Sequence, residues 1–403
     1  MVLKVAKRGQ VPPFIVMDVM HAAAEREAEG KEVLHLEVGQ PSTGLPDGAR
    51  QALSEKLFAE TLGYTVARGI PELRNRIAQH YRERDGLTVD PEQIFITTGS
   101  STGFLLSFLA AFEAGDRVAL AAPGYPAYRH ILTALGIEPV LIPVGPDTRY
   151  QPSPDHLRAL ARPGGPGLDG VIVASPSNPT GTVVDAAEMA ALCEVCDQLG
   201  IRMISDEIYH GLTYGARKTA SALAQSENAV IINSFSKYFC MTGWRLGWLV
   251  LPKDMLRAVE CLAQNFFISA PAISQWAGVL VFDQIQALEA NVHRYARNRD
   301  VLLEALPKAG FERFAPPDGA FYLYADATAL LERAYGRDWA SGGADTDSRA
   351  LCAKILQETG VAITPGLDFD PARGGGFVRF SFCGATETME QAGDRLMAWS
   401  QAL

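Results

Sequence analysis

The chain lacks the sequence signatures of two large enzyme classes. Its seven histidines include no HExxH pair, and no GxxxxGKS or GxxxxGKT motif occurs. These motifs carry the catalytic groups of zinc hydrolases and P-loop nucleotidases. The sequence therefore predicts neither of these chemistries, and it predicts no metal site.

Cysteine, positive charge and long apolar runs are also scarce. Six cysteines among 403 residues do not make a disulfide framework, so a cytoplasmic location is expected. Lysine and arginine number 36 against 46 acidic residues, and the net charge of −10 disfavours a nucleic-acid partner. No apolar run reaches the roughly 18–20 residues of a membrane span. The N-terminus also lacks the apolar core of a secretory signal, so no membrane partner is expected.

The sequence does contain an alternation of short apolar runs and helix-like segments between residues 90 and 290. Runs such as IFITT, VALAA, VIVAS and VIINS are continuous and bounded by Gly, Pro and Ser, as is typical of buried parallel strands. Segments with helical spacing, such as AAEMAALCEVCDQLG, lie between them. We therefore predict an α/β fold with a large, doubly wound and mostly parallel sheet.

The length and a change of pattern predict two domains. A chain of 403 residues exceeds what one hydrophobic core usually supports. Beyond residue 290 a long polar helix is followed by FERFAPPDGAFYLYAD and by a helix–strand pair that ends in GGFVRFSFCG. We assign residues 46–290 to the large domain, and residues 1–45 together with 291–403 to a smaller α+β domain.

Polar residues follow four of the predicted strands, at the edge where parallel α/β sheets bind their ligands. They are Gly99, Ser100 and Ser101 after IFITT, Asn178 after VIVASP, Asp206 and Tyr209 after RMIS, and Lys237 and Arg245 after VIINSFS. Because the carboxyl ends of parallel strands meet at one edge, these residues are expected to form a single site.

The chemistry of this set meets the requirements of pyridoxal 5′-phosphate. A serine-rich turn at a helix N-terminus offers N–H groups to a phosphate, and Ser234 and Arg245 would close on it from the other side. The carboxylate of Asp206 would keep a pyridine nitrogen protonated, which makes the ring an electron sink. An amide and a phenol of the set would hydrogen-bond the phenolic oxygen. Lys237 is far from any acid in sequence and is expected to have a low pKa, suited to Schiff-base formation.

The stretch SFSKYFCMTGWRLGW, at 234–248, resembles the lysine signature of the class I/II pyridoxal-phosphate aminotransferases. Further resembling motifs follow the family's order over nearly the whole chain: LEVGQPSTGLP, GYTVARGIPELRNRIAQHY, TTGSSTGF, APGYPAY, SPSNPTG, SDEIY and FVRFSF. The resemblance implies the aspartate-aminotransferase-like fold and a homodimer with active sites at the subunit interface. It also implies ping-pong transfer of an amino group between amino acids and 2-oxo acids through Schiff bases.

The resemblance also assigns roles to residues. Lys237, Asp206 and Tyr209 would be catalytic. The implied cofactor-binding residues are Tyr64, Gly99, Ser100, Ser101, Tyr125, Asn178, Asp206, Tyr209, Ser234, Ser236, Lys237 and Arg245, and the implied substrate-binding residues are Gly39, Asn178 and Arg379. Tyr64 is expected to reach the neighbouring subunit's cofactor phosphate, Tyr125 to stack on the pyridine ring, and Arg379 to bind the substrate α-carboxylate.

One departure from the family pattern bears on the substrate. Aspartate-specific members with a second substrate arginine supply it from the partner subunit, shortly before the helix that follows the lysine region. The corresponding stretch here, CLAQNFFISAPAISQW, contains no Arg or Lys, and Asn265 lies near the expected position. A buried, unpaired carboxylate costs several kcal/mol. The expected amino donor therefore has a neutral or apolar side chain, aromatic side chains included.

Two other functions are compatible with the same fold. A carbon–sulfur β-lyase or a cyclopropane-forming synthase shares the lysine, aspartate and arginine set, because all begin with the same Cα carbanion. A non-catalytic ligand-sensing module is disfavoured, because every expected catalytic residue is present. His210 is interpreted as a packing or surface residue without a catalytic role, Cys240 as a small buried side chain, and Cys193 and Cys196 as buried thiols on one helix face.

Overall fold

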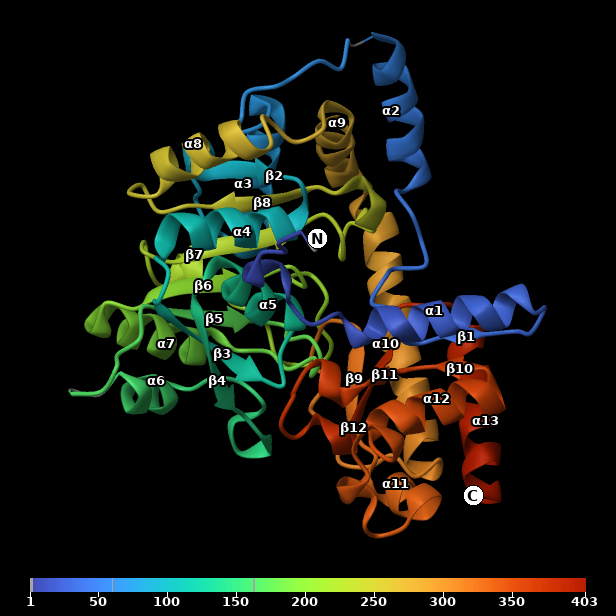
Figure 1. Cartoon of the computed structure of the whole chain (residues 1–403). Helices are drawn as coiled ribbons and strands as arrows, with labels where there is room; N and C mark the ends of the chain where they lie inside the picture. Colours follow the sequence, from blue (N-terminus) through green and yellow to red (C-terminus); the bar gives the residue numbers. More distant parts are fainter. Residues whose placement is uncertain (1–2, 60, 162–163) are drawn as a thin grey trace.

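A seven-stranded sheet forms the centre of the larger part of the molecule (Figure 1). The computed structural model describes residues 3–59, 61–161 and 164–403. The strands are β2 (Ile94–Thr97), β3 (Arg117–Ala122), β4 (Glu138–Pro143), β5 (Gly170–Ala174), β6 (Arg202–Asp206), β7 (Val230–Ser234) and β8 (Gly247–Val250), in the order β2-β8-β7-β6-β5-β3-β4. Only β8 runs antiparallel to its neighbours. The predicted mostly parallel sheet is confirmed, whereas β4 was not anticipated from the sequence.

Helices cover both faces of this sheet. Alternate strand residues point to opposite faces, so Ile172 and Ile204 belong to one buried cluster and Val171 and Met203 to another. The helices of this part are α2 (Asp47–Ala59), α3 (Pro71–Asp85), α4 (Gly99–Ala111), α5 (Pro126–Leu135), α6 (Pro154–Leu160), α7 (Ala186–Leu199), α8 (Leu256–Phe266) and α9 (Ala272–Val281). Burial on both faces explains why the strand sequences are continuously apolar.

The C-terminal part has its own sheet. Strands β11 (Thr364–Pro365), β12 (Phe377–Ser381) and β9 (Tyr322–Asp326) pair antiparallel in that order. The N-terminal strand β1 (Leu34–His35) pairs with β10 (Val361–Ala362), which attaches the start of the chain to this part. The surrounding helices are α1 (Ile15–Ala28), α10 (Ile285–Lys308), α11 (Thr328–Tyr335), α12 (Ser348–Thr359) and α13 (Thr386–Ala402).

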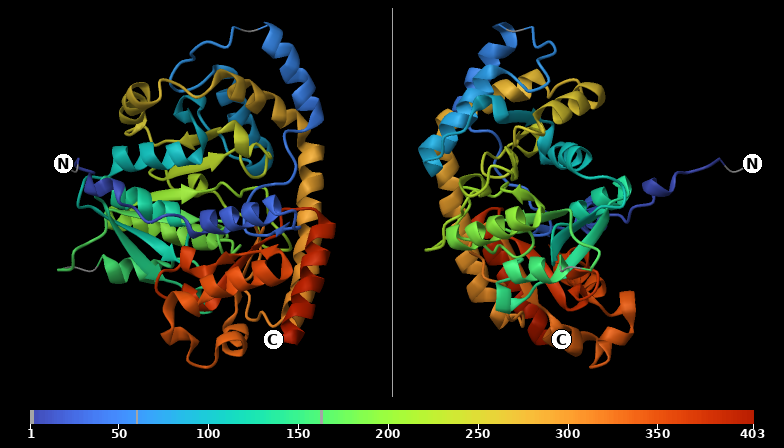
Figure 2. Two further views of the ribbon diagram at one scale, coloured as in Figure 1. Left: turned by 45° about the vertical axis from the view of Figure 1, so that its right-hand side comes forward. Right: turned by 90° about the vertical axis from the view of Figure 1, so that its left-hand side faces the viewer.

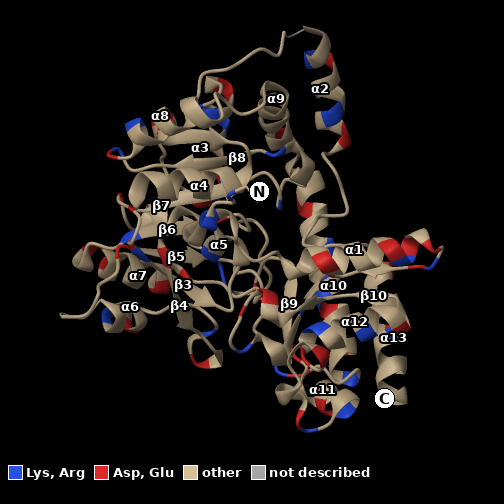
Figure 3. Cartoon of the chain, viewed as in Figure 1, with Lys and Arg blue, Asp and Glu red and all other residues tan. Residues whose placement is uncertain are grey.

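Helix α10 links the two parts, running from beside α9 down to α13 (Figure 1). Basic and acidic positions are interspersed on the outer helices, with both signs on α1 and on α2 (Figure 3). Within the described residues, every helix is too short or too polar to span a lipid bilayer.

Candidate active site

A cavity of about 490 Å³ lies at the carboxyl ends of β5, β6 and β7, beside the first turn of α4. It collects most of the residues that the sequence singled out. Those that line it are Gly39, Ser100, Ser101, Tyr125, Asn178, Asp206, Tyr209, Ser236, Lys237, Arg245 and Arg379. Gly99, Ser234 and Tyr64 are not part of the lining.

One side of the cavity presents donors for an anion. Ser100 and Ser101 stand in the first turn of α4, where backbone N–H groups lack helical partners. Gly99, which precedes these serines, has φ +74°, and a Cβ at this position would lie only 2.6 Å from Nη2 of Arg245. The absence of a side chain on Gly99 therefore lets the guanidinium approach the helix N-terminus. Arg245 donates to the Thr242 carbonyl over 3.0 Å and forms no ion pair within the described residues.

Ser234 does not line the cavity but contacts Ser236, which does. Its Oγ donates to Ser236 Oγ over 2.9 Å and lies 3.1 Å from the Leu246 carbonyl oxygen. It also accepts the Ser236 backbone N–H over 3.1 Å. Ser234 therefore orients Ser236, which does line the cavity.

Lys237 extends into the cavity from the loop that follows β7. Its Nζ donates to the Gly39 carbonyl over 2.6 Å. Burial lowers the pKa of the lysine to about 8, and the charges of Arg379 and Arg245 act in the same direction. Asp206 opposes the shift, as does the Cys383 thiol. With a pKa of about 8, roughly a tenth of this amine is unprotonated at pH 7, far more than for an ordinary lysine, and the unprotonated form is the one that a nucleophile or a base requires.

The carboxyl group of Asp206 is buried at the end of β6 and is held by two donors. Tyr128 donates from its hydroxyl to Oδ2, and the Ile208 backbone N–H donates to Oδ1 over 3.1 Å. Burial raises the pKa of Asp206 to about 6, while the two donors and Lys237 lower it. Tyr128 was missed by the sequence reasoning. Its position three residues after Tyr125, across the start of α5, was the available signal, because residues three apart share a helix face.

Arg379 is almost completely buried, and no carboxylate pairs with it within the described residues. Its Nη1 donates to Asn178 Oδ1 over 2.9 Å, and its Nη2 donates to the Glu37 carbonyl and to Thr364 Oγ1. The guanidinium carbon lies 4.4 Å from the Tyr322 ring centroid and 4.7 Å from that of Phe369. A buried cation without a counter-ion, facing a cavity, favours an anionic ligand such as a carboxylate.

Tyr322 was also missed by the sequence reasoning. Its hydroxyl lies 2.8 Å from that of Tyr209, so the two phenols are coupled. The same hydroxyl packs so closely against Gly39 that a Cβ there would lie 1.8 Å from the Tyr322 oxygen. Gly39 is therefore required to be glycine by a side chain 283 positions away, a relationship that local sequence cannot reveal.

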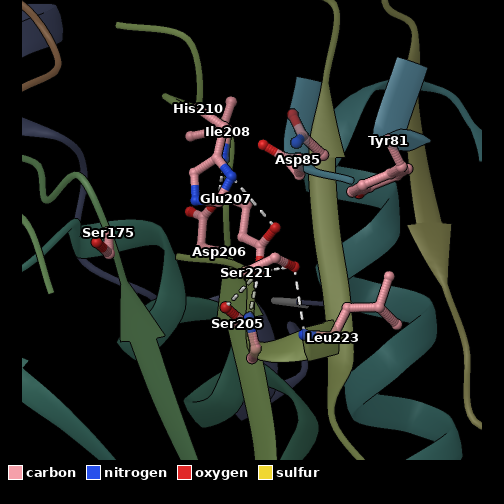
Figure 4. A network of polar contacts seen from close by, with 12 residues as sticks. Tyr81, Asp85, Ser175, Ser205, Asp206, Glu207, Ile208, His210, Ser221 and Leu223 are labelled. Atoms are coloured by element: carbon pink, nitrogen blue, oxygen red, sulfur yellow. Dashed lines mark hydrogen bonds and ion pairs between the residues drawn. The ribbon is translucent and has the colours of Figure 1, made fainter. Parts of the chain in front are cut away.

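A second polar network surrounds Glu207, which directly follows β6 (Figure 4). Glu207 Oε1 accepts hydrogen bonds from Ser205 Oγ, Ser221 Oγ and the Ala222 backbone N–H. Burial raises the pKa of Glu207 to about 7 and holds that of His210 well below its usual range. None of these residues lines the cavity. The interpretation of His210 as a packing residue is confirmed, and Cys193, Cys196 and Cys240 are likewise buried thiols.

Tyr64 lies apart from this cavity. Its side chain is 85% exposed and lines a second hollow, of about 510 Å³, together with residues 269–273. The contact predicted for Tyr64 is with the neighbouring subunit's cofactor phosphate, and it stays a prediction.

The arrangement fits pyridoxal 5′-phosphate. The anion site formed by Ser100, Ser101, Ser236 and Arg245 suits its phosphate, and the glycine at position 99 keeps that site open. A buried carboxylate, an amide, a phenol and an amine of lowered pKa face the same space, which matches the polar groups of the ring.

Comparisons with known proteins agree with this chemistry. The model of the family described as "Aminotransferase class I and II" matches residues 31–396. The chain is 52% identical over 399 residues to a valine–pyruvate aminotransferase of Mycobacterium tuberculosis, covering 98% of each chain. It is 30% identical to an aspartate/prephenate aminotransferase of Cereibacter sphaeroides, again covering 98% of each.

Solved structures give the same result. A crystal structure of an aminotransferase from Mycobacterium tuberculosis superposes with a TM-score of 0.93, at 51% identity, over 100% of both chains. The aspartate aminotransferase of Thermus thermophilus with maleate superposes with a TM-score of 0.87, at 29% identity, over 98% of this chain and 100% of that one.

Proposed function

The chain belongs to the class I and II aminotransferases, and we propose that it takes the amino group from an α-amino acid with an apolar side chain. It is a pyridoxal-phosphate enzyme that transfers amino groups between amino acids and 2-oxo acids. The donor class is our own inference. The observation that carries it is the number of positive charges in the cavity.

Among the described residues that line the cavity, the positively charged ones are Lys237, Arg245 and Arg379. We assign Arg245 to the cofactor phosphate, Lys237 to the reaction and Arg379 to the substrate α-carboxylate. This chain's described lining leaves no cation for a second substrate carboxylate, and the stretch 261–276, from which a partner subunit would supply one, contains no Arg or Lys. A dicarboxylate would therefore bury an unpaired charge. The remaining wall includes Phe14, Val16, Met17 and Val38, which suits an apolar side chain. The Mycobacterium relative is named for valine and pyruvate, which supports this donor class.

When bound, the cofactor supplies an electron sink that stabilises negative charge at the substrate Cα. Ser100, Ser101, Ser236 and Arg245 would hold its phosphate, with Ser234 orienting Ser236. Tyr125 would pack against its ring, Asn178 and Tyr209 would bind its phenolic oxygen, and Asp206 would keep its pyridine nitrogen protonated.

The chain's own groups then handle the substrate and the proton. Arg379 and the Gly39 backbone orient the α-carboxylate. Lys237 Nζ, with a pKa of about 8, accepts a proton from Cα and returns it later, as a general base within the cavity.

The test is a panel of amino donors with pyruvate or 2-oxoglutarate as acceptor. Apolar donors such as valine, leucine and alanine are expected to react, and aspartate and glutamate to react poorly. Preference for a dicarboxylate donor would overturn the proposal. Release of ammonia and pyruvate from cysteine-type donors without an acceptor would instead indicate a β-lyase. Lys237→Ala serves as the inactive control.

We further propose that the protein is a homodimer and that Tyr64 reaches the partner's cofactor phosphate. Phe58 on α2 is 93% exposed, and Val66, two residues after Tyr64, is 62% exposed. Leu3, in the projecting N-terminal segment, is 83% exposed (Figure 2). Such apolar side chains favour burial against another chain. Light scattering tests the mass, and Tyr64→Phe is expected to weaken cofactor binding.

Two further assignments are part of this proposal. Residues 46–290 form the large domain, and residues 1–45 and 291–403 the small one, supported by their separate sheets and by the β1–β10 pairing. A cytoplasmic location is supported by the six cysteines, all of which are free thiols.

A further inference from the structure

The beginning of helix α1 forms an apolar wall of the active-site cavity, to which Phe14, Val16 and Met17 contribute. The Phe14 ring centroid lies 6.0 Å from that of Tyr125 and 5.7 Å from the His130 ring. This wall therefore stands next to the residue assigned to the cofactor ring. A substrate side chain beyond Cα would meet these apolar groups.

A residue near the C-terminal end of the sequence, Asp368, binds the beginning of α1 and so fixes this apolar wall. Phe14 occupies the N-cap position of α1 and provides no side-chain cap, so the first N–H groups of the helix need another acceptor. Asp368 supplies it: Oδ1 accepts the Ile15 N–H over 3.0 Å, and Oδ2 lies 3.4 Å from the Val16 nitrogen. These positions are more than 350 residues apart in sequence.

The Asp368 carboxylate is 1% exposed. A buried carboxylate is tolerated only where donors compensate it, and the two N–H groups together with the positive end of the helix dipole do so here. The backbone of Asp368 is itself fixed, because Arg129 Nη2 on α5 donates to its carbonyl over 2.7 Å. Asp368 thus connects α1 to the larger sheet's helices.

The next residue contacts the opposite end of the substrate site. The Phe369 ring lies 4.7 Å from the Arg379 guanidinium carbon, and its carbonyl accepts the Gly124 N–H over 3.1 Å. One two-residue segment therefore positions both the group assigned to the α-carboxylate and the wall assigned to the side chain. The distance between these two ends limits which side chains fit.

We propose that Asp368 is a positioning residue for donor selection: by capping α1 it holds Phe14 and Val16 against the donor's side chain. The inference rests on the proposed apolar donor class and adds how that class is recognised. Asp368 itself does not line the cavity and acts only through α1.

The test compares donors of increasing side-chain size in the first half-reaction, followed by the cofactor's absorbance in holoenzyme mixed with donor alone. For Asp368→Ala, the ratio of kcat/KM for valine to that for alanine is expected to fall about tenfold, which corresponds to losing contact with about one or two methyl groups. Phe14→Ala is expected to lower the same ratio. The double variant should lose less than the two single losses combined, because both remove one wall.

The matched control is Asp185→Ala. Asp185 also accepts two backbone N–H groups at a helix start, those of Ala187 and Glu188 on α7, but neither it nor α7 lines the cavity. This control is expected to leave the valine-to-alanine ratio unchanged. Should Asp368→Ala fail to fold, Asp368→Asn retains one acceptor oxygen and is expected to give an intermediate ratio.

The proposal is overturned by a wild-type ratio in Asp368→Ala or Asp368→Asn, or by an equal change in Asp185→Ala. Independent, fully additive losses from Asp368→Ala and Phe14→Ala would also refute it. If the proposed apolar donor class were wrong, the result would be different, because the wild-type holoenzyme would prefer acidic amino donors. The size dependence of the variants, measured on a short and a long donor of the preferred class, would still decide the role of Asp368.

Discussion

Removing one hydroxyl group, in Tyr128→Phe, tests how the buried Asp206 carboxylate is kept charged. The Tyr128 hydroxyl donates to Oδ2 of Asp206, and the Ile208 N–H to Oδ1. Burial raises the pKa of Asp206 to about 6, and these donors counteract it. Without the hydroxyl, the charged form loses one of its two donors while the burial remains.

The magnitude follows from the strength of that hydrogen bond. A hydrogen bond to a charged group contributes about 1.5–3 kcal/mol, and a pKa change of one corresponds to about 1.4 kcal/mol. The pKa of Asp206 in the apoenzyme is therefore expected to rise from about 6 to about 7–8. At neutral pH much of the carboxyl would then be protonated, and its attraction for a protonated pyridine ring would be lost.

The assay is the affinity of the apoenzyme for pyridoxal 5′-phosphate as a function of pH. Wild-type affinity is expected to fall as the pH drops through about 6, and that of Tyr128→Phe to fall already below about 7–8. Tyr214→Phe is the control, because it removes a buried phenol that donates to the Ala320 carbonyl outside the cavity. An unchanged acid midpoint in Tyr128→Phe, or an equal shift in Tyr214→Phe, would refute the reasoning.

Three further predictions concern the same cavity. Arg379→Lys replaces a guanidinium that can donate two parallel hydrogen bonds by a single ammonium, and it should raise the KM of every amino donor by roughly tenfold to a hundredfold. Half-reaction kinetics on amino donors of different size check this expectation. An effect that depends on side-chain size would contradict the assignment of Arg379 to the α-carboxylate. Gly99→Ala places a Cβ 2.6 Å from Arg245 Nη2 at φ +74° and should lower both stability, by about 1–2 kcal/mol, and cofactor affinity. Gly200→Ala, at φ +69° with no atom within 4 Å, should lower stability alone, and equal cofactor loss in both variants would argue against a phosphate site beside Gly99. Asp206→Asn should stabilise the apoenzyme above pH 6. Burial raises the pKa of Asp206 in the folded state to about 6, above its value in the unfolded chain. The folded protein therefore keeps its full stability below the unfolded pKa and loses stability as the pH rises through about 6, because the buried carboxyl must then ionise. The gain approaches about 3 kcal/mol near pH 8 and vanishes near pH 4, and urea unfolding that shows no such pH dependence would count against a charged, buried Asp206.

The sequence was sufficient for the features that depend on local pattern. Buried parallel strands require continuous apolar runs, so β2, β3, β5, β6 and β7 could be predicted from the sequence. The polar residues that follow these strands were correctly placed at one edge of the sheet. Strand β4 was missed because EPVLIP is broken by two prolines and has mostly half-exposed or exposed positions. Its place at the sheet edge makes that composition acceptable.

The sequence by itself determined the sheet, the family motifs and the reactive lysine, because each is written in a contiguous stretch with its own period or order. Tertiary structure alone decided what surrounds those groups: Tyr128 on Asp206, Tyr322 against Gly39, and Asp368 at the start of α1. These contacts join segments from different elements, in two cases separated by hundreds of residues, and arise only when both parts of the chain pack together. Hydrogen bonding and burial at these contacts set the pKa values of the site and the shape of the cavity. Both the shifted pKa values and the cavity arise only when the chain is folded.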